Sequence, residues 1–132
     1  MNKFLEKIQI STSNAPSAIG AYSQAIKVDK LIFISGQIPL NPKTMEVVDG
    51  GVDIQIKQVL LNLKAIIDEA GANLEQVVKI NVYLDDLSNF QAVNEQMKFF
   101  FEEPYPARAA VEVSRLPKDV QIEMDAILFI DN

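Results

Sequence analysis

The sequence contains no cysteine and no histidine among its 132 residues. Without cysteine the chain has no disulfide, no thiolate nucleophile and no zinc–thiolate site. Without histidine it also lacks the side chain that most often serves as a metal ligand, or as a general base near neutral pH. Any chemistry must therefore use carboxylates, tyrosine, serine or threonine, lysine, arginine or the backbone, and we expect no metal site.

The chain also lacks a surplus of basic residues and a long apolar run. Its net charge is −6, whereas a nucleic-acid-binding protein needs a basic face, so we expect no nucleic-acid partner. No segment approaches the roughly 18 apolar residues of a membrane span, and residues 1–20 lack the apolar stretch of a signal peptide. With 48% hydrophobic and 23% charged residues, the chain is predicted to be one cytoplasmic globular domain over residues 1–132.

Changes in hydrophobic period predict the order of the structural elements. In chain order we expect a hairpin over residues 25–36, a helix over 53–70, a strand over 76–86, a second helix over 88–103 and strands over 107–114 and 121–130. Asp53 is predicted to cap the first helix, and Gly71 suits the position after its end. Ser88 and Gln91 would form a capping box on the second helix. The turn over residues 115–119 would join the last two strands.

This order predicts an α+β fold in which both helices pack on one face of a mixed sheet. Alternation assigns to the helix-covered face Val78, Ile80, Val82, Leu84, Ile122, Met124, Ala126 and Leu128. It assigns to the other face Lys79, Asn81, Tyr83, Glu123, Asp125, Ile127 and Phe129. A sheet face of this mixed character typically meets another subunit, so we expect a homo-oligomer.

An arginine stands second in the small, apolar strand that begins at residue 107. Arg108 cannot shed its charge, so something must balance it. One interpretation is a salt bridge to Glu112, or to Glu123 if the last two strands pair through their turn. The other is an anion from outside the chain, since a guanidinium matches a carboxylate bidentately. The residues alone leave both interpretations open.

Two further segments have both a structural and a functional interpretation. Tyr22 lies in the glycine-containing loop "GAYSQA" and could simply pack at the loop edge. Ser35 and Gly36 end a predicted strand, but the Gly-x-Ser-x-Gly pattern of a serine nucleophile is missing and no histidine could activate the hydroxyl. A glycine there more often lets the backbone approach another group closely.

Several motifs together resemble the RidA family of reactive-intermediate (enamine/imine) deaminases, also called the YjgF family. The resemblance runs from about residue 14 to 127 and is carried by "NAPSAIGAYSQA", "ISGQIPLNPKT", "NLKAIIDEAGANLEQVVKINVYLDDLSNF", "VNE" and "PARAAVEVSRLPKDVQIEMDAI". It implies a chorismate-mutase-like α+β fold and a homotrimer with a central barrel and clefts between subunits. It further implies hydrolysis of 2-imino acids, such as 2-iminobutanoate and 2-iminopropanoate, to 2-keto acids and ammonia. These imines come from pyridoxal-phosphate-dependent dehydratases, and the family member itself needs no cofactor.

The resemblance also implies roles for individual residues. Arg108 would grip the substrate carboxylate, and Glu123 would position or activate water. The residues that would line the cleft are Tyr22, Ser35, Gly36, Asn94 and Ala110. Ala110 stands where many members have cysteine, so a mechanism that needs a thiol is excluded for this chain.

Two other functions are weighed against the deaminase. A non-catalytic trimer that binds or senses 2-keto acids or similar carboxylates would use Arg108 to bind the carboxylate. It would catalyse no reaction, so Glu123 would have no catalytic role. A ribonuclease or translation inhibitor, an activity attached to relatives, conflicts with the acidic charge and the missing histidine.

Overall fold

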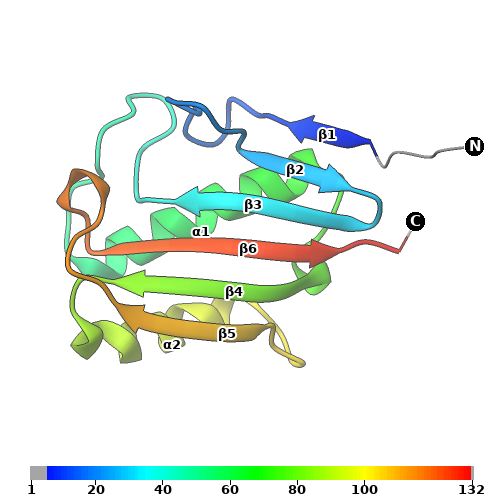
Figure 1. Cartoon of the computed structure of the whole chain (residues 1–132). Helices are drawn as coiled ribbons and strands as arrows, with labels where there is room; N and C mark the ends of the chain where they lie inside the picture. Colours follow the sequence, from blue (N-terminus) through cyan, green and yellow to red (C-terminus); the bar gives the residue numbers. More distant parts are fainter. Residues whose placement is uncertain (1–5, 132) are drawn as a thin grey trace, which may run out of the picture.

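The computed structural model describes residues 6–131 and arranges six strands and two α-helices in two layers (Figure 1). The strands are β1 (Lys7–Ile10), β2 (Ala25–Val28), β3 (Leu31–Gln37), β4 (Val77–Leu84), β5 (Ala107–Glu112) and β6 (Ile122–Phe129). The helices are α1 (Val52–Glu69) and α2 (Phe90–Phe100), with short 3₁₀ turns at η1 (Leu74–Gln76), η2 (Leu87–Asn89) and η3 (Pro117–Asp119). Neither α-helix combines the length and the apolar character that a membrane crossing requires.

The six strands form one mixed sheet in the order β1-β2-β3-β6-β4-β5. The predicted β2–β3 hairpin is confirmed. The last two strands, whose pairing the sequence left open, do not pair with each other, because β4 lies between them. β5 pairs only with β4, in parallel, and the chain then crosses over to reach β6 through η3. The cause is burial: β4 and β6 carry the large core side chains and take the centre, whereas β5 consists mainly of small or exposed residues and takes the edge.

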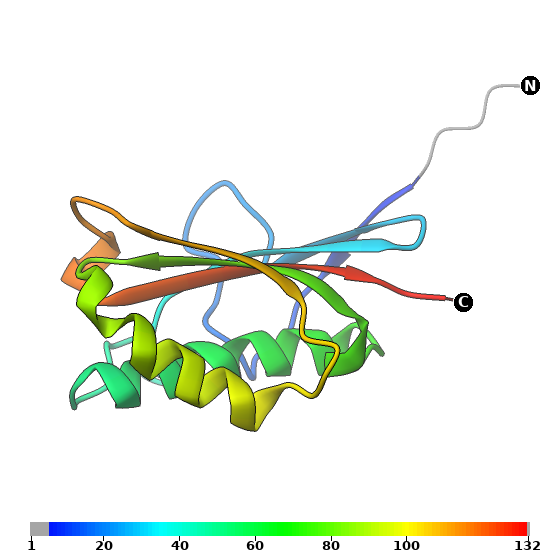
Figure 2. The ribbon, with the colours of Figure 1, turned by 90° about the horizontal axis from the view of Figure 1, so that it is seen from below.

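Both helices cover the same face of the sheet, as predicted (Figure 2). The helix-covered face buries Ile80, Val82, Leu84, Ile122, Met124, Ala126 and Leu128 against the apolar side of α1. Val78 is the exception, with 45% of its surface exposed. The register against β6 shifts between Val77 and Lys79, and this bulge lets Val77 take the core position instead.

The helix ends differ in part from the predictions. The N-cap of α1 is Gly51, and Asp53 lies in the first turn instead. The predicted capping box on α2 is also absent, because the helix continues from η2, whose N-cap Asp86 accepts a hydrogen bond from the backbone of Ser88. Gly71 does follow α1 with a φ of +73°, the left-handed conformation that glycine adopts without strain.

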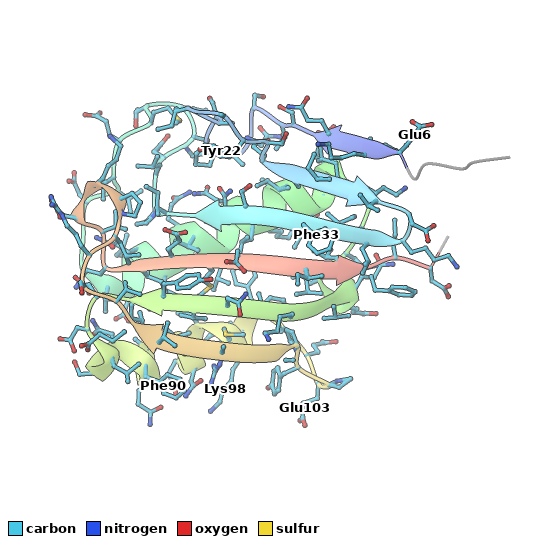
Figure 3. The ribbon with its side chains drawn as sticks, viewed as in Figure 1. Glu6, Tyr22, Phe33, Phe90, Lys98 and Glu103 are labelled. Carbon is cyan, nitrogen blue, oxygen red and sulfur yellow. The ribbon has the colours of Figure 1, made fainter. Side chains whose placement is uncertain are left out.

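The uncovered face of the sheet has the mixed character that was predicted. On it, the side-chain amide of Asn81 donates to Asp125 Oδ1 at 2.8 Å, and the Tyr83 hydroxyl donates to Asp125 Oδ2 at 2.9 Å. Towards the other end of the strands the face is apolar, with Phe33 and Phe129 each nearly half exposed. Figure 3 shows Phe33 on this side, turned away from the helices. Burial of this face against other subunits stays a prediction.

Candidate active site

Arg108 is held on the helix-covered side of the sheet by three residues of α2. Its Nη1 donates to Asn94 Oδ1 at 2.6 Å and lies 3.7 Å from Met97 Sδ. Its guanidinium carbon stacks over the ring of Phe90, 4.7 Å from the ring centre. Phe90, Asn94 and Met97 are four and three residues apart, so successive turns of α2 present all three to the same strand. Residues of α2 therefore contact one face of the guanidinium plane, through Phe90, and one of its edges, through Asn94.

The charge of Arg108 is not balanced within the described part of the chain. The ion pairs of residues 6–131 are Lys64–Asp68 and Arg115–Asp119, and neither includes it. Glu112, one proposed partner, instead accepts a hydrogen bond from the backbone of Leu87 at 2.8 Å. The salt-bridge interpretation of Arg108 is therefore wrong.

The free edge of the guanidinium opens into a groove of about 360 Å³ between α2 and β5. The groove is lined by Gln91, Asn94, Met97, Lys98, Tyr105, Pro106 and Arg108. It contains two cationic side chains and no acidic one. We refer to it below as the arginine groove, and its composition suits an anionic ligand.

A second pocket, of about 310 Å³, lies on another part of the surface. It brings together three of the predicted site residues, Tyr22, Gly36 and Glu123, with the surrounding Pro16, Ser17, Ile19, Gln37, Ile38, Leu40, Met45 and Pro117. Tyr22 is 49% exposed, so its ring forms part of the rim. We refer to this site below as the glutamate pocket.

The loop that carries Tyr22 is fixed by one buried amide side chain. Gln24, which is 3% exposed, donates through Nε2 to the carbonyls of Ala15 and Pro16 at 3.3 and 2.8 Å. Its Oε1 accepts from the backbone of Thr12 at 2.7 Å. These bonds satisfy backbone groups that the loop would otherwise bury unpaired. The rim of the glutamate pocket is thus anchored to the start of β2.

Gly36 is where the backbone of β3 comes close to another group, as expected for this glycine, and that group is the carboxylate of Glu123. A Cβ at residue 36 would overlap Glu123 Oε2 and lie 2.9 Å from Glu123 Cδ. Any residue other than glycine would therefore displace the carboxylate. The conformation of Glu123 depends on this missing side chain.

Burial raises the pKa of Glu123 above its ordinary value of 4.5, and the negative charge of nearby Asp125 raises this pKa further. No lysine or arginine of residues 6–131 forms an ion pair with Glu123 to oppose the shift. The pKa of Tyr83 is also raised, first because its hydroxyl donates to Asp125 and then because of burial. A carboxylate in these surroundings is a stronger base than one in water.

The two sites lie on opposite faces of the sheet. Arg108 pairs with Ile80 on the helix-covered side, whereas Glu123 pairs with Tyr83 on the uncovered side. In Figure 3, Tyr22 lies near the β1–β2 edge, and Phe90 and Lys98 lie at the opposite, β5 edge. Within one chain the structure therefore joins Arg108 with Asn94, and Glu123 with Tyr22 and Gly36, but not the two groups with each other.

The other two predicted site residues line neither site. The hydroxyl of Ser35 donates to the carbonyl of Ser23 at 2.6 Å and so braces the start of β2. Ala110 packs against the hydrophobic core. Ser35 lies next to Gly36 in β3, and Ala110 lies two residues after Arg108 in β5. Direct contact of either residue with a ligand stays a prediction.

Sequence reasoning missed six residues of the arginine groove or of the arginine's support: Phe90, Gln91, Met97, Lys98, Tyr105 and Pro106. None of the six was singled out as a site residue, and Gln91 was assigned only to the predicted capping box. One signal was available: Asn94 is a polar residue between two apolar positions of the same helical stripe. A polar side chain at such a position often has a specific partner.

Comparison with known proteins shows that this chain shares its sequence pattern and its fold with other proteins. The family model described as Endoribonuclease L-PSP matches residues 12–130. A RutC family protein of Pyrococcus abyssi is 55% identical over 125 residues, which cover 95% of this chain and 98% of the relative. The 2-iminobutanoate/2-iminopropanoate deaminase of Rattus norvegicus is 48% identical over 127 residues, 96% of this chain and 92% of the relative. The crystal structure of RidA from an Antarctic Psychrobacter matches with a TM-score of 0.90 at 49% identity, over 93% of this chain and 99% of that one.

Proposed function

Because the chain belongs to the Endoribonuclease L-PSP family, which includes the RidA and RutC proteins, we propose that it hydrolyses reactive 2-imino acids to 2-keto acids and ammonia. The substrates are 2-iminobutanoate and 2-iminopropanoate, the compounds named in the activity of the rat relative. RNA cleavage, which the family description names, is disfavoured by the net charge of −6 and the lack of histidine.

The observation that carries this proposal is the unbalanced charge of Arg108. Its guanidinium is held by Asn94 at 2.6 Å and by the ring of Phe90, and no acidic side chain lines its groove. A 2-imino acid presents a carboxylate beside the reacting carbon. A bidentate pair with Arg108 would fix that carbon in place, and such positioning contributes much of the rate of a bound reaction.

Because the two sites lie on opposite faces of the sheet, one substrate can meet both only if a second copy of the chain supplies one of them. We place the arginine groove of one subunit against the glutamate pocket of its neighbour in a homotrimer. The partly exposed apolar residues of the uncovered sheet face, Phe33 and Phe129 among them, supply the contact surface. A head-to-tail interface of this kind closes into a ring with one site at each junction.

The chemistry of the proposed reaction needs one base and no nucleophile from the protein. The carbon of the C=N bond is already electrophilic, and Glu123 takes a proton as the water oxygen adds to it. The carbinolamine forms when that proton passes to the nitrogen. Glu123 then takes the hydroxyl proton and passes it to the same nitrogen, so that the C–N bond breaks, the C=O bond forms and ammonia leaves. The raised pKa of Glu123 suits both transfers, since the group must accept a proton and then return it.

A coupled assay tests the proposal. Threonine dehydratase and threonine generate the imine, and semicarbazide traps what has not been hydrolysed. We expect the protein to reduce the trapped imine and Arg108→Ala to behave as though no protein were added. Glu123→Gln should still bind 2-oxobutanoate while its rate falls by about a hundredfold or more. A wild-type protein that binds 2-oxobutanoate and leaves the trapped imine unchanged would instead be a carboxylate sensor.

A further inference from the structure

The arginine groove holds a second cation that the proposed reaction does not use. Lys98 lines the groove together with Arg108, and neither forms an ion pair within the part of the chain that the structure describes. The chain as a whole has 18 acidic and 12 basic residues. A groove that contains two cations and no acidic side chain therefore has the opposite charge to the chain as a whole. The local charge is suited to a ligand with two negative groups.

The positions of the two cations suit the ends of a short dicarboxylate. Lys98 follows Asn94 by one helical turn, about 6 Å along the axis of α2, and Asn94 is the residue that holds Arg108 at 2.6 Å. Met97, whose sulfur contacts Arg108, lines the same groove. A ligand carboxylate on Arg108 would thus direct its carbon chain past an apolar side chain towards Lys98, which lies at the β5 edge of the sheet (Figure 3).

The size of the groove agrees with a ligand larger than 2-iminobutanoate. Its volume of about 360 Å³ lies within the range of sites that enclose whole small molecules. An imino acid with a two-carbon side chain that binds at Arg108 would leave the Lys98 end of the groove unused. A second carboxylate would fill that end and form a charge-assisted hydrogen bond there.

We infer, on the basis of the function proposed above, that this chain prefers 2-imino acids with a carboxylate side chain, and that Lys98 determines this specificity. 2-Iminosuccinate and 2-iminoglutarate represent the class. Lysine is a point charge on a flexible stem, whereas arginine imposes a fixed fork. Lys98 can therefore follow side chains that differ by one carbon, and both compounds should be accepted.

The stable keto acid products allow this specificity to be measured without turnover. Calorimetric titration at low salt would compare 2-oxoglutarate with 2-oxobutanoate. For the wild-type protein we expect 2-oxoglutarate to bind about tenfold more tightly, the usual effect of one hydrogen bond to a charged group. Lys98→Gln should bring the two affinities together by weakening 2-oxoglutarate alone. Lys57→Gln, the same charge change on the exposed side of α1, should leave their ratio unchanged.

Equal binding of the two keto acids to the wild-type protein would overturn the inference, and so would a ratio that survives Lys98→Gln. These outcomes are separate from failure of the proposed function. A protein that shows the expected ratio but hydrolyses no imine retains the Lys98 site and loses the deaminase assignment. A protein that hydrolyses 2-iminobutanoate but binds both keto acids equally retains the deaminase assignment and loses the Lys98 site.

Discussion

Arg108 and Glu123 lie on opposite faces of the same sheet, with strand β4 between their strands. Arg108 pairs with Ile80, whose side chain is fully buried under the helices, and Glu123 pairs with Tyr83 on the uncovered side. Neither side chain can reach around the sheet to the other. If both act on one substrate, they must come from different copies of the chain.

This relationship predicts complementation between two inactive variants. Arg108→Ala lacks the carboxylate clamp but keeps an intact glutamate pocket, and Glu123→Gln has the reverse defect. When equal amounts are unfolded and refolded together, about one site in four should combine the two intact halves in a head-to-tail trimer. We expect about a quarter of the wild-type activity in the semicarbazide assay.

The control for complementation uses two defects in the same half of the site. A refolded mixture of Arg108→Ala and Arg108→Leu contains no intact arginine and should stay inactive. If the mixture with Glu123→Gln stays equally inactive although mixed oligomers are isolated by two affinity tags, the site is not shared between subunits.

A second prediction concerns the close approach of Gly36 to Glu123. In Gly36→Ala the new methyl group would overlap Glu123 Oε2. The far end of a flexible side chain can move away, so we expect the melting temperature to change little and the catalytic rate to fall by tenfold or more. Gly51→Ala is the matched control, because a Cβ there meets nothing within 4 Å. Unchanged activity in Gly36→Ala would show that the position of Glu123 is not critical.

The pH dependence of the rate follows from the raised pKa of Glu123. Its carboxyl is desolvated and faces the charge of Asp125 on the same strand, with the side chains of Tyr83 and Tyr22 nearby. The base is active when deprotonated, so the rate should fall as the pH drops through a pKa above the ordinary 4.5. Glu123→Gln should lose this limb from its residual pH–rate profile. Persistence of the limb would assign the titration to another group.

The same shift predicts that Glu123 lowers stability at neutral pH. A carboxyl whose pKa is higher in the folded than in the unfolded state favours folding only while it is protonated, and that contribution is lost as the pH rises through the folded pKa. Glu123→Gln should therefore melt at a higher temperature than the wild type at pH 7. The difference should shrink as the pH falls and vanish below 4.5, the ordinary value. A variant less stable at pH 7 would show that the carboxylate makes compensating contacts.

Hydrophobic period was sufficient to predict both helices, five of the six strands and the layers of this fold, but it did not place β1. The helical stripe of α1 and the alternation along β6 are local properties, and both were predicted correctly. The order of strands was not local: β5 and β6 are neighbours in sequence, but β4 is more apolar and takes the place between them. The exposure of Val78 likewise depends on a bulge against β6, which the sequence of β4 does not reveal.

The candidate site could be predicted only in part for the same reason. Motifs identified Arg108 and Glu123 individually. Whether they can meet depends on strand pairing, which the sequence left open, and β4 lies between β5 and β6. The support of Arg108 by Phe90 depends on how α2 lies across β5, which is a tertiary contact between an aromatic residue and a cation that are 18 positions apart.

The last prediction isolates the role of that aromatic ring. The ring of Phe90 lies 4.7 Å from the guanidinium carbon, and a cation–π contact at an exposed site contributes about 0.5–1 kcal/mol. Phe90→Leu should therefore weaken 2-oxobutanoate binding about threefold and raise KM more than it lowers kcat, since the ring positions the clamp without touching the reacting atoms. Phe90→Tyr keeps the ring and should restore binding. Phe99→Leu makes the same change on the same helix, at a side chain that is 87% exposed, and should have no effect. If Phe90→Leu acted only by loosening the fold, it would lower the melting temperature without this selective rise in KM, and Phe90 would not be a positioning residue.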